Sequence, residues 1–347
     1  MNPDRLKQFR ENAPRNDSRS ATARAVLSLS YRRTVNRHIS LGALALIVLL
    51  LAGRAAAETP NRITILYDSF GKSQSLTMDW GFAALVEYGG KRILFDTGNN
   101  AQIFEHNVKA AGVDLRNLDC VVMSHRHGDH MGGLAYLLKV NPTVKIYAPK
   151  ERSGVYGDDP PSSTWYRKDP SLPVEQRYYG GVPPEVIRMG SAWPSANFQL
   201  IDKNTEIAAG MHLIALVSDK PGTLELRELS LAIRTPAGLV LVVGCSHPGV
   251  EHIVQEASVI DPHINILFGG LHQIQAPDPE VERIAAVLHN QYKLERVAPG
   301  HCTGEPEFAA LKRAFGDHYV YAGVGSVVDL PGGTLAVSYT HLTLPTN

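Results

Sequence analysis

The most informative stretch of this sequence is SHRHGDH, residues 124–130, which directly follows an apolar run at residues 120–123. It places three imidazoles and one carboxylate in a single short loop: His125, His127, Asp129 and His130. Imidazole and carboxylate are ligands that Zn²⁺ prefers. Two histidines two residues apart at a strand end can point into one site, and the next pair then turns toward a second position as a helix begins. A motif of four ligand-type side chains is far more specific than a single histidine, so the loop predicts a metal site.

This HxHxDH pattern resembles the metal-binding loop of the metallo-β-lactamase superfamily. Three later motifs resemble one branch of it, the metal-dependent hydrolases related to the ribofuranosylaminobenzene 5′-phosphate (dihydropterin) synthases. These motifs are Gly244-Cys245-Ser246-His247, Gly269-Gly270-Leu271-His272 and Pro299-Gly300-His301-Cys302-Thr303-Gly304. The resemblance covers about Ile63 to Leu330. It implies an α/β (α+β) fold, the four-layer αββα sandwich, in which two mixed sheets face each other with helices outside.

Hydrophobic periodicity independently predicts a doubled unit. The runs 82–88 and 91–96 form a hairpin around Gly89-Gly90, and Leu118–Met123 is a strand too apolar to have an exposed face. The second half repeats this order at Leu229–Thr235, Leu239–Val243 and Ile264–Phe268. Active sites of open α/β sheets form at the carboxyl ends of strands. Five candidate residues fall at such ends: Asp96, His125, His247, His272 and His301.

The resemblance suggests two metals, with zinc as the first choice and manganese or iron as alternatives. A catalytic zinc typically has three protein ligands and one open position. We expect His125, His127 and His247 at the first metal, and Asp129, His130 and His301 at the second. The third ligand of the first metal is open, because many superfamily members have a histidine near the position of Glu228. Cys245 or His247 replaces the usual bridging carboxylate, so a mononuclear or asymmetric site is the alternative.

Other side chains near the motifs are assigned supporting roles. Asp96 is expected to orient a ligand, with direct ligation as the alternative. Asp129 and His272 are the candidate catalytic residues, and His272 would bind substrate or protonate a leaving group. Cys245 and Cys302 each lie beside a candidate ligand, as free thiols or as a disulfide. The glycine pairs lack the GxGxxG frame, so no nucleotide-binding residue is predicted.

The N-terminal region, residues 1–57, is predicted to be a signal peptide. A basic stretch precedes the apolar run Ile39–Gly53, and Ala55-Ala56-Ala57 then offers a small-residue cleavage site. The apolar run is short for a membrane span, so an uncleaved anchor is the alternative, and it would be the protein's only membrane contact. Export to the periplasm or the medium is therefore expected.

The rest of the chain is expected to form a single domain, residues 58–337. Proline and aromatic residues concentrate at 151–210 and suggest a flap over the metal loop. The tail at 338–347 continues no pattern of the fold and resembles translated vector sequence. The oligomeric state cannot be inferred from these patterns.

Charge argues against a nucleic-acid substrate. The chain has 34 basic and 34 acidic residues, of which 10 and 3 lie in residues 1–57, so the remainder carries 24 basic and 31 acidic residues, a net charge of −7. An acidic body gives no electrostatic reason to bind a polyanion. We therefore predict a hydrolase that uses a metal-activated hydroxide on a small ester, phosphoester or lactone-like substrate. The alternatives are a synthase or transferase like the dihydropterin enzymes, and a non-catalytic metal-binding module.

Overall fold

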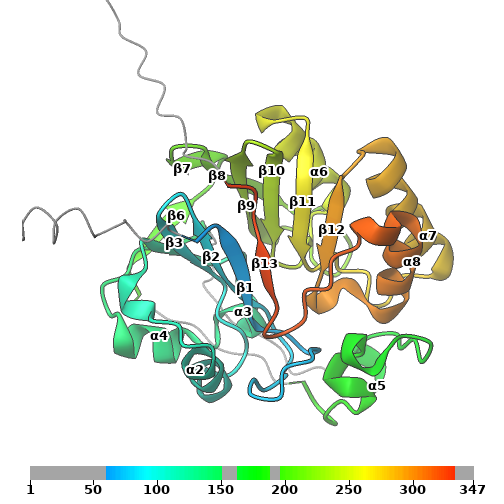
Figure 1. Cartoon of the computed structure of the whole chain (residues 1–347), viewed down its shortest axis with the longest axis horizontal. Helices are drawn as coiled ribbons and strands as arrows, with labels where there is room; N and C mark the ends of the chain where they lie inside the picture. Colours follow the sequence, from blue (N-terminus) through cyan, green and yellow to red (C-terminus); the bar gives the residue numbers. More distant parts are fainter. Residues whose placement is uncertain (1–59, 151–161, 188–195, 333–347) are drawn as a thin grey trace, which may run out of the picture. The chain divides into compact units, whose positions relative to one another are not determined.

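The computed structural model describes residues 60–150, 162–187 and 196–332. These residues form two mixed β-sheets with helices on the outer faces (Figure 1). This arrangement confirms the αββα sandwich expected from the motifs. The predicted signal peptide at 1–57 and the tail at 338–347 lie outside the described residues.

The first sheet has seven strands in the order β13-β1-β2-β3-β4-β5-β6. Its strands β1 to β3 pair antiparallel, whereas β3 to β6 run parallel. The short strand β4 is buried along its whole length, as its apolar sequence requires. The bounds are β1 (Arg62–Tyr67), β2 (Ala83–Tyr88), β3 (Lys91–Phe95), β4 (Cys120–Val122), β5 (Ile146–Pro149), β6 (Phe198–Ile201) and β13 (Val327–Asp329).

The second sheet has six strands in the order β12-β11-β10-β9-β8-β7. Strands β7 to β10 pair antiparallel, and β10 to β12 run parallel. Each sheet thus passes from a hairpin into parallel strands, which confirms the doubled unit read from the periodicity. The bounds are β7 (Thr205–Ala208), β8 (Met211–Val217), β9 (Arg227–Thr235), β10 (Gly238–Val243), β11 (Ile264–Gly269) and β12 (Arg296–Pro299).

Three apolar layers hold the sandwich together. One core lies between the sheets and includes Phe95, Val242 and Phe268. A second packs the first sheet against α2 (Ala101–Ala110) and α4 (Leu134–Val140), and a third packs the second sheet against the remaining long helices. Those helices are α6 (Val250–Ile260), α7 (Asp278–Ala286) and α8 (Glu305–Phe315). Fully burying one large apolar side chain contributes about 1.5–3 kcal/mol, so the layers are the main source of stability.

The structure differs from the expected elements in its edge strands. Within the expected flap at 151–210, residues 198–201 and 205–208 are strands β6 and β7 of the two sheets. Their side chains are largely half-buried or exposed, so no apolar run marks them. Tyr319 makes only an isolated bridge with Val297, and the last strand of the first sheet is β13.

The described part of the flap packs on the site end of the sandwich. It contains the short helix α5 (Ser162–Trp165), while Tyr156 and Trp193 fall outside the described residues. The Tyr166 ring stacks on Trp80 with centroids 5.7 Å apart, and Tyr178 meets Trp80 edge-on at 5.2 Å. Aromatic pairs of this kind add about 0.5–1.5 kcal/mol each beyond area burial. The flap is therefore anchored through its aromatic side chains.

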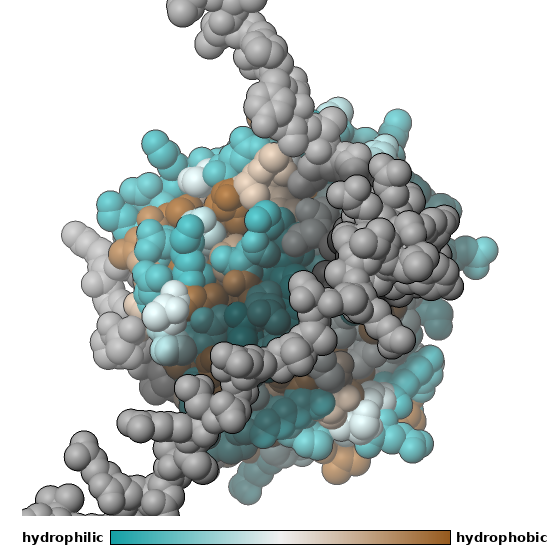
Figure 2. All heavy atoms as spheres, turned by 60° about the vertical axis from the view of Figure 1, so that its left-hand side comes forward, coloured by the Kyte–Doolittle hydropathy of each residue, from teal (hydrophilic) through white to brown (hydrophobic). Residues whose placement is uncertain are grey.

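The visible surface is mostly hydrophilic, with hydrophobic residues in small groups between polar ones (Figure 2). None of the helices in the described ranges is long and apolar enough to cross a membrane.

Candidate metal centre

The metal-binding loop is held by a close backbone approach. It leaves β4 and enters α3 (Gly128–Met131), where Gly132 follows. A Cβ atom on Gly132 would lie 1.8 Å from the carbonyl oxygen of Asn99, so only glycine fits there. The amide of Thr97 donates to the carbonyl of His130 at 2.7 Å. The loop is therefore fixed against the segment that follows β3.

The first donor group is His125, His127 and His247. Their ligand atoms lie within 4.8 Å of one another, and His125 Nε2 is 3.1 Å from His127 Nδ1. The His247 ring centroid is 4.8 Å from each of the other two. The structure therefore brings together the three residues expected at the first metal.

The second donor group is Asp129, His130 and His301. His130 Nε2 and His301 Nε2 are 3.1 Å apart, and Asp129 Oδ2 is 3.3 Å from His301 Nε2. Asp129 Oδ2 is 3.8 Å from His130 Nε2. All three are buried, so the residues expected at the second metal also meet, although they come from opposite halves of the chain.

Cys245 lies between these groups. Its sulfur is 3.2 Å from His130 Nε2, and its donor atom also lies within 4.8 Å of that of His125. Cys245 is therefore placed to contact a metal in either position.

Hydrogen bonds set the tautomers that metal binding needs. Ser124 Oγ donates to Asp96 Oδ2 at 2.7 Å and is 2.8 Å from His125 Nδ1, which leaves Nδ1–H of His125 to donate to Ser124. His130 Nδ1 lies 2.6 Å from Asp96 Oδ2 and donates to it. In both histidines Nε2 is thus the ring nitrogen left to face a metal, as expected when the other ring nitrogen is hydrogen-bonded.

Asp96 contacts both the loop and a donor histidine, because its carboxylate accepts hydrogen bonds from Ser124 and His130. Its buried carboxylate also accepts from the Ser124 amide at 2.7 Å. Asp96 adopts a left-handed backbone with φ 57°, an uncommon conformation that aspartate tolerates better than most residues.

Electrostatics favours neutral imidazoles in the first group. Burial, reinforced by neighbouring imidazoles, lowers the pKa of His125 and of His247 well below the ordinary value, and burial lowers the pKa of His127 to about 4. In the second group, burial alone would lower the pKa of His130, but Asp96 and Asp129 raise it to about 9. Burial would raise the pKa of Asp129, but His130 and His301 hold it well below its usual range.

The donor set fits metal ions. Among the described residues, both ring nitrogens of His247 and Oδ1 of Asp129 are buried without a hydrogen-bond partner. Buried polar atoms are normally satisfied, and leaving one unpaired costs about 1–3 kcal/mol. Nitrogen and oxygen donors in two three-residue groups match the ligands of zinc and related divalent cations.

Glu228 holds the backbone of the loop that carries His247. Its buried carboxylate accepts from the amides of Cys245, Ser246 and His247 at 3.0, 2.7 and 2.8 Å, so it faces the backbone, away from the donor atoms. Burial raises the pKa of Glu228 to about 7, although these amides oppose the shift. His247, carried by this loop, lies beside His125 and His127, with its ring centroid 4.8 Å from each.

Asp68 is a site residue that the sequence analysis did not select. It follows β1, and its buried carboxylate accepts from the His301 amide, with Oδ2 at 2.9 Å, and from the Ser69 amide at 2.7 Å. Burial raises the pKa of Asp68 to about 7. The sequence could have indicated this residue, because Asp68 lies at the end of a strand, as Asp96 does.

We expect Asp68→Asn to weaken metal binding by about 10–100-fold at the group that contains His301, as is usual when a residue that orients a ligand is changed. An amide can present only one acceptor oxygen to the two amides that Asp68 now holds. Metal affinity measured by competition with a chelator checks this, and Asp317→Asn at an exposed aspartate is the control. Equal affinities for both variants would contradict the assigned role.

A thiol–imidazole pair forms one wall of the site. His272 hydrogen-bonds to Cys302, and its ring centroid is 4.1 Å from that of His247. Burial would raise the pKa of Cys302, but hydrogen bonds from Cys245 and His272 and the charge of His301 hold it well below its ordinary value. Cys120, Cys245 and Cys302 are all free thiols in the structure.

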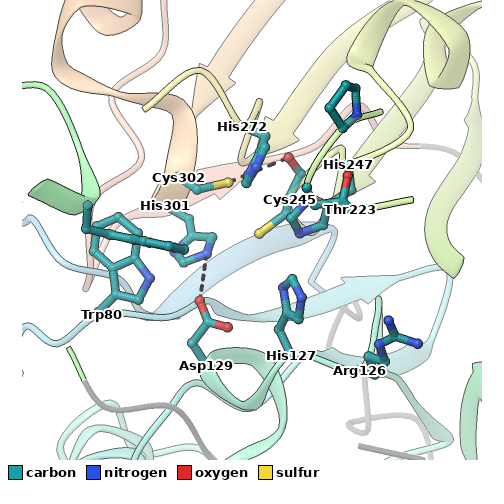
Figure 3. Close-up of a pocket in the computed structure, with 13 residues that line it drawn as sticks. Trp80, Arg126, His127, Asp129, Thr223, Cys245, His247, His272, His301 and Cys302 are labelled. Atoms are coloured by element: carbon teal, nitrogen blue, oxygen red, sulfur yellow. Dashed lines mark hydrogen bonds and ion pairs between the residues drawn. The ribbon is translucent and has the colours of Figure 1, made fainter. Parts of the chain in front are cut away.

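The donor groups open onto a cavity of about 600 Å³ (Figure 3). Its lining includes His127, Asp129, His247, His272 and His301, so both candidate catalytic residues and donors from both groups face the same space. Trp80 lies at one side of the cavity and Arg126 at another. Trp165 also lines the cavity and meets Trp80 edge-on, with centroids 6.2 Å apart. A small molecule that enters the cavity would meet the donor groups directly.

Two facing mixed sheets with outer helices, and histidine and aspartate groups gathered at one end, define a metallo-β-lactamase-type protein. Residues 81–250 match the model of the metallo-beta-lactamase superfamily. These residues therefore carry a metallo-β-lactamase domain, as the HxHxDH motif implied.

Individual relatives agree with this assignment. The 7,8-dihydropterin-6-methyl-4-(beta-D-ribofuranosyl)-aminobenzene-5'-phosphate synthase of Methanocaldococcus jannaschii is 27% identical over 265 residues, which cover 70% of this chain and 86% of that protein. The solved structure of a metal-dependent hydrolase of the β-lactamase superfamily is similar with a TM-score of 0.60 and 25% identity, covering 78% of this chain and 99% of that one. A shorter match to ribonuclease Z of Clostridium kluyveri, 38% identical over 75 residues, covers 22% of this chain and 24% of that protein.

Proposed function

We propose that this protein is a metal-dependent hydrolase of a small ester, phosphoester or lactone-like substrate. The observation that carries the proposal is that two three-residue donor groups face one cavity of about 600 Å³. Two divalent cations held there would polarise the scissile bond and lower the pKa of bound water toward about 7. The similarity to a metal-dependent hydrolase at 25% identity supports the same class.

The protein's own side chains would hold the metals, transfer protons and exclude water. His125, His127 and His247 stay neutral near pH 7 because burial lowers each pKa, so their lone pairs remain available. Asp129 lines the cavity, and its Oδ1 has no hydrogen-bond partner among the described residues, so it can accept a proton. His272 stands at the opposite wall, where it can donate a proton to a leaving group. The indoles of Trp80 and Trp165 exclude water from one side.

A second candidate is a synthase that joins two small molecules. The 27% identity to a dihydropterin ribofuranosylaminobenzene phosphate synthase favours it, because that match covers most of both chains.

Two features favour the hydrolase over this synthase and over a nuclease. The N-terminal signal predicted from the sequence supports an exported protein, and an exported protein would not meet cytosolic intermediates. The acidic character of residues 58–347 supports a small substrate over a nucleic acid.

We expect the purified full chain to contain about two zinc-type ions and to hydrolyse one class of test substrate. The panel is p-nitrophenyl phosphate, bis-p-nitrophenyl phosphate, a simple ester and nitrocefin. Turnover should fall by about 10²–10⁴-fold in His127→Ala, because one donor of the first group is lost. Bound metal without turnover on any substrate would count against the hydrolase and favour the synthase.

A further inference from the structure

Two thiols from distant parts of the chain meet at the wall of the cavity. The donor atoms of Cys245, Cys302 and His272 lie within 4.8 Å of one another, and Cys302 Sγ donates to the Cys245 carbonyl at 3.6 Å. Figure 3 shows both sulfur atoms beside the donor groups. Neither the fold nor the proposed hydrolysis requires a second thiol here, because Cys302 is absent from both predicted ligand groups.

We propose that Cys245 and Cys302 are an oxidation site at which a small peroxide forms a reversible disulfide that switches off the metal centre. One thiol attacks a peroxide oxygen and becomes a sulfenic acid, while the other oxygen leaves as water or an alcohol. The second thiol attacks the sulfenic sulfur, water leaves, and the S–S bond forms. With hydrogen peroxide, two thiols and one peroxide give one disulfide and two water molecules.

Local structure allows the two sulfurs to approach. A disulfide bond is about 2.05 Å long, so the thiols must move together by roughly 2–3 Å or less. Cys245 follows β10, and Cys302 lies in the single turn His301–Thr303 between β12 and α8, so loops can move while the strands remain paired. Both residues line the cavity, which gives a small oxidant a route to them.

The third cysteine provides an internal control. Cys120 lies in β4 within the core between the sheets and is not among the residues that line the cavity. Burial raises its pKa to about 12, which keeps it a poorly reactive thiol. Selective loss of two thiols out of three is therefore the expected signature.

A Cys245–Cys302 disulfide would disturb metal binding through the surroundings of both cysteines. Cys245 Sγ lies 3.2 Å from His130 Nε2, and Cys302 directly follows His301 in the chain. Drawing the sulfurs together pulls on the loop that carries His247 of the first group and on the turn that carries His301 of the second. His272 would also lose its hydrogen bond to Cys302. The loss of activity rests on the proposed hydrolase function, whereas disulfide formation and metal loss do not.

The test treats the metal-loaded full chain with hydrogen peroxide and then removes the oxidant. Thiols titrated after denaturation should fall from three to one, and the intact mass should fall by two hydrogen atoms. Peptide mapping without reductant should link Cys245 to Cys302, and bound metal should fall by at least about half. Dithiothreitol should restore the thiols, and metal should rebind when it is supplied again.

Variants make the outcome decisive. Cys120→Ser should still form the disulfide, with titratable thiols falling from two to none, while Cys302→Ser and Cys302→Ala should form none. Oxidation that only adds oxygen atoms, links separate chains or spares the thiols would overturn the oxidation site. A disulfide that leaves metal content unchanged would overturn the switch. Both readouts remain valid if the protein hydrolyses no test substrate, so a failure of the hydrolase proposal is recognised separately.

Discussion

His247→Ala is expected to lower bound metal from about two ions per chain to one and to slow hydrolysis by roughly a thousandfold. His247 is buried, and neither of its ring nitrogens has a hydrogen-bond partner among the described residues. Its ring lies 4.8 Å from both His125 and His127, so no other imidazole in the described ranges completes that group. Losing one ion removes its activation of the bound water, and we expect a cost like that of losing a general acid or base, about 10²–10⁴-fold. Metal analysis and kcat/KM on the best substrate of the panel check both effects.

Two further variants distinguish a metal ligand from a residue that only positions a ligand. His106→Ala removes an exposed histidine of α2 and should leave metal and rate unchanged. Glu228→Gln should keep two metals and lose about 10–100-fold in affinity, because the amide oxygen can still accept from part of the 245–247 backbone. If Glu228→Gln lost one metal while His247→Ala kept two, Glu228 would be the ligand and the assignment would be reversed.

The fold was predictable wherever burial leaves an unbroken apolar run. Strands β4, β10 and β11 are completely buried, so their sequences carry a signal that no exposed face dilutes. Strands β6 and β7 lie at sheet edges, where half-exposed positions accept polar residues. Their pairing partners decide their structure, and partners distant in the chain leave no mark on a local pattern.

The donor residues were predictable because they lie at the ends of strands, and these ends meet at one edge of the sandwich. The HxHxDH loop and the histidines at strand ends led to all six proposed donors. Residues that act through the backbone were harder to recognise. Asp68 and Glu228 bind amide groups of the loops that carry His301 and His247, and neither belongs to the HxHxDH motif. Nothing in a one-dimensional pattern tells a carboxylate that holds a loop from one that holds a metal.

The buried carboxylates of this protein divide by their partners. Asp68, Asp96 and Glu228 each accept hydrogen bonds that offset the cost of burial. Glu307, in the first turn of α8, is fully buried, and neither carboxylate oxygen has a partner among the described residues. Burial raises the pKa of Glu307 to about 9, and the charges of Glu282 and Glu280 add to the shift. Burial of Glu307 therefore destabilises the folded protein, and the side chain has no assigned role in the metal centre.

Glu307→Gln is expected to stabilise the protein at alkaline pH and to have little effect near pH 5. The folded-state pKa of about 9 lies above the unfolded value near 4.5, so the unfolded state releases the proton first. Stability is then lost as pH rises between these two values, by up to about 1.4 kcal/mol per pH unit. Glutamine keeps the shape and never ionises. We expect it to raise the free energy of unfolding by about 2–4 kcal/mol at pH 8.

Urea denaturation at pH 5 and pH 8 measures this difference for the wild-type protein and Glu307→Gln at equal metal loading. Asp317→Asn, at an exposed position, controls for the loss of one negative charge and should change stability by less than about 0.5 kcal/mol at both pH values. A gain from Glu307→Gln that is the same at pH 5 and pH 8 would show improved packing and no linked proton. A loss at both would mean that the carboxyl group makes a stabilising contact. Only a gain that grows with pH fits an acid that stays protonated because its site offers no partner for a charge.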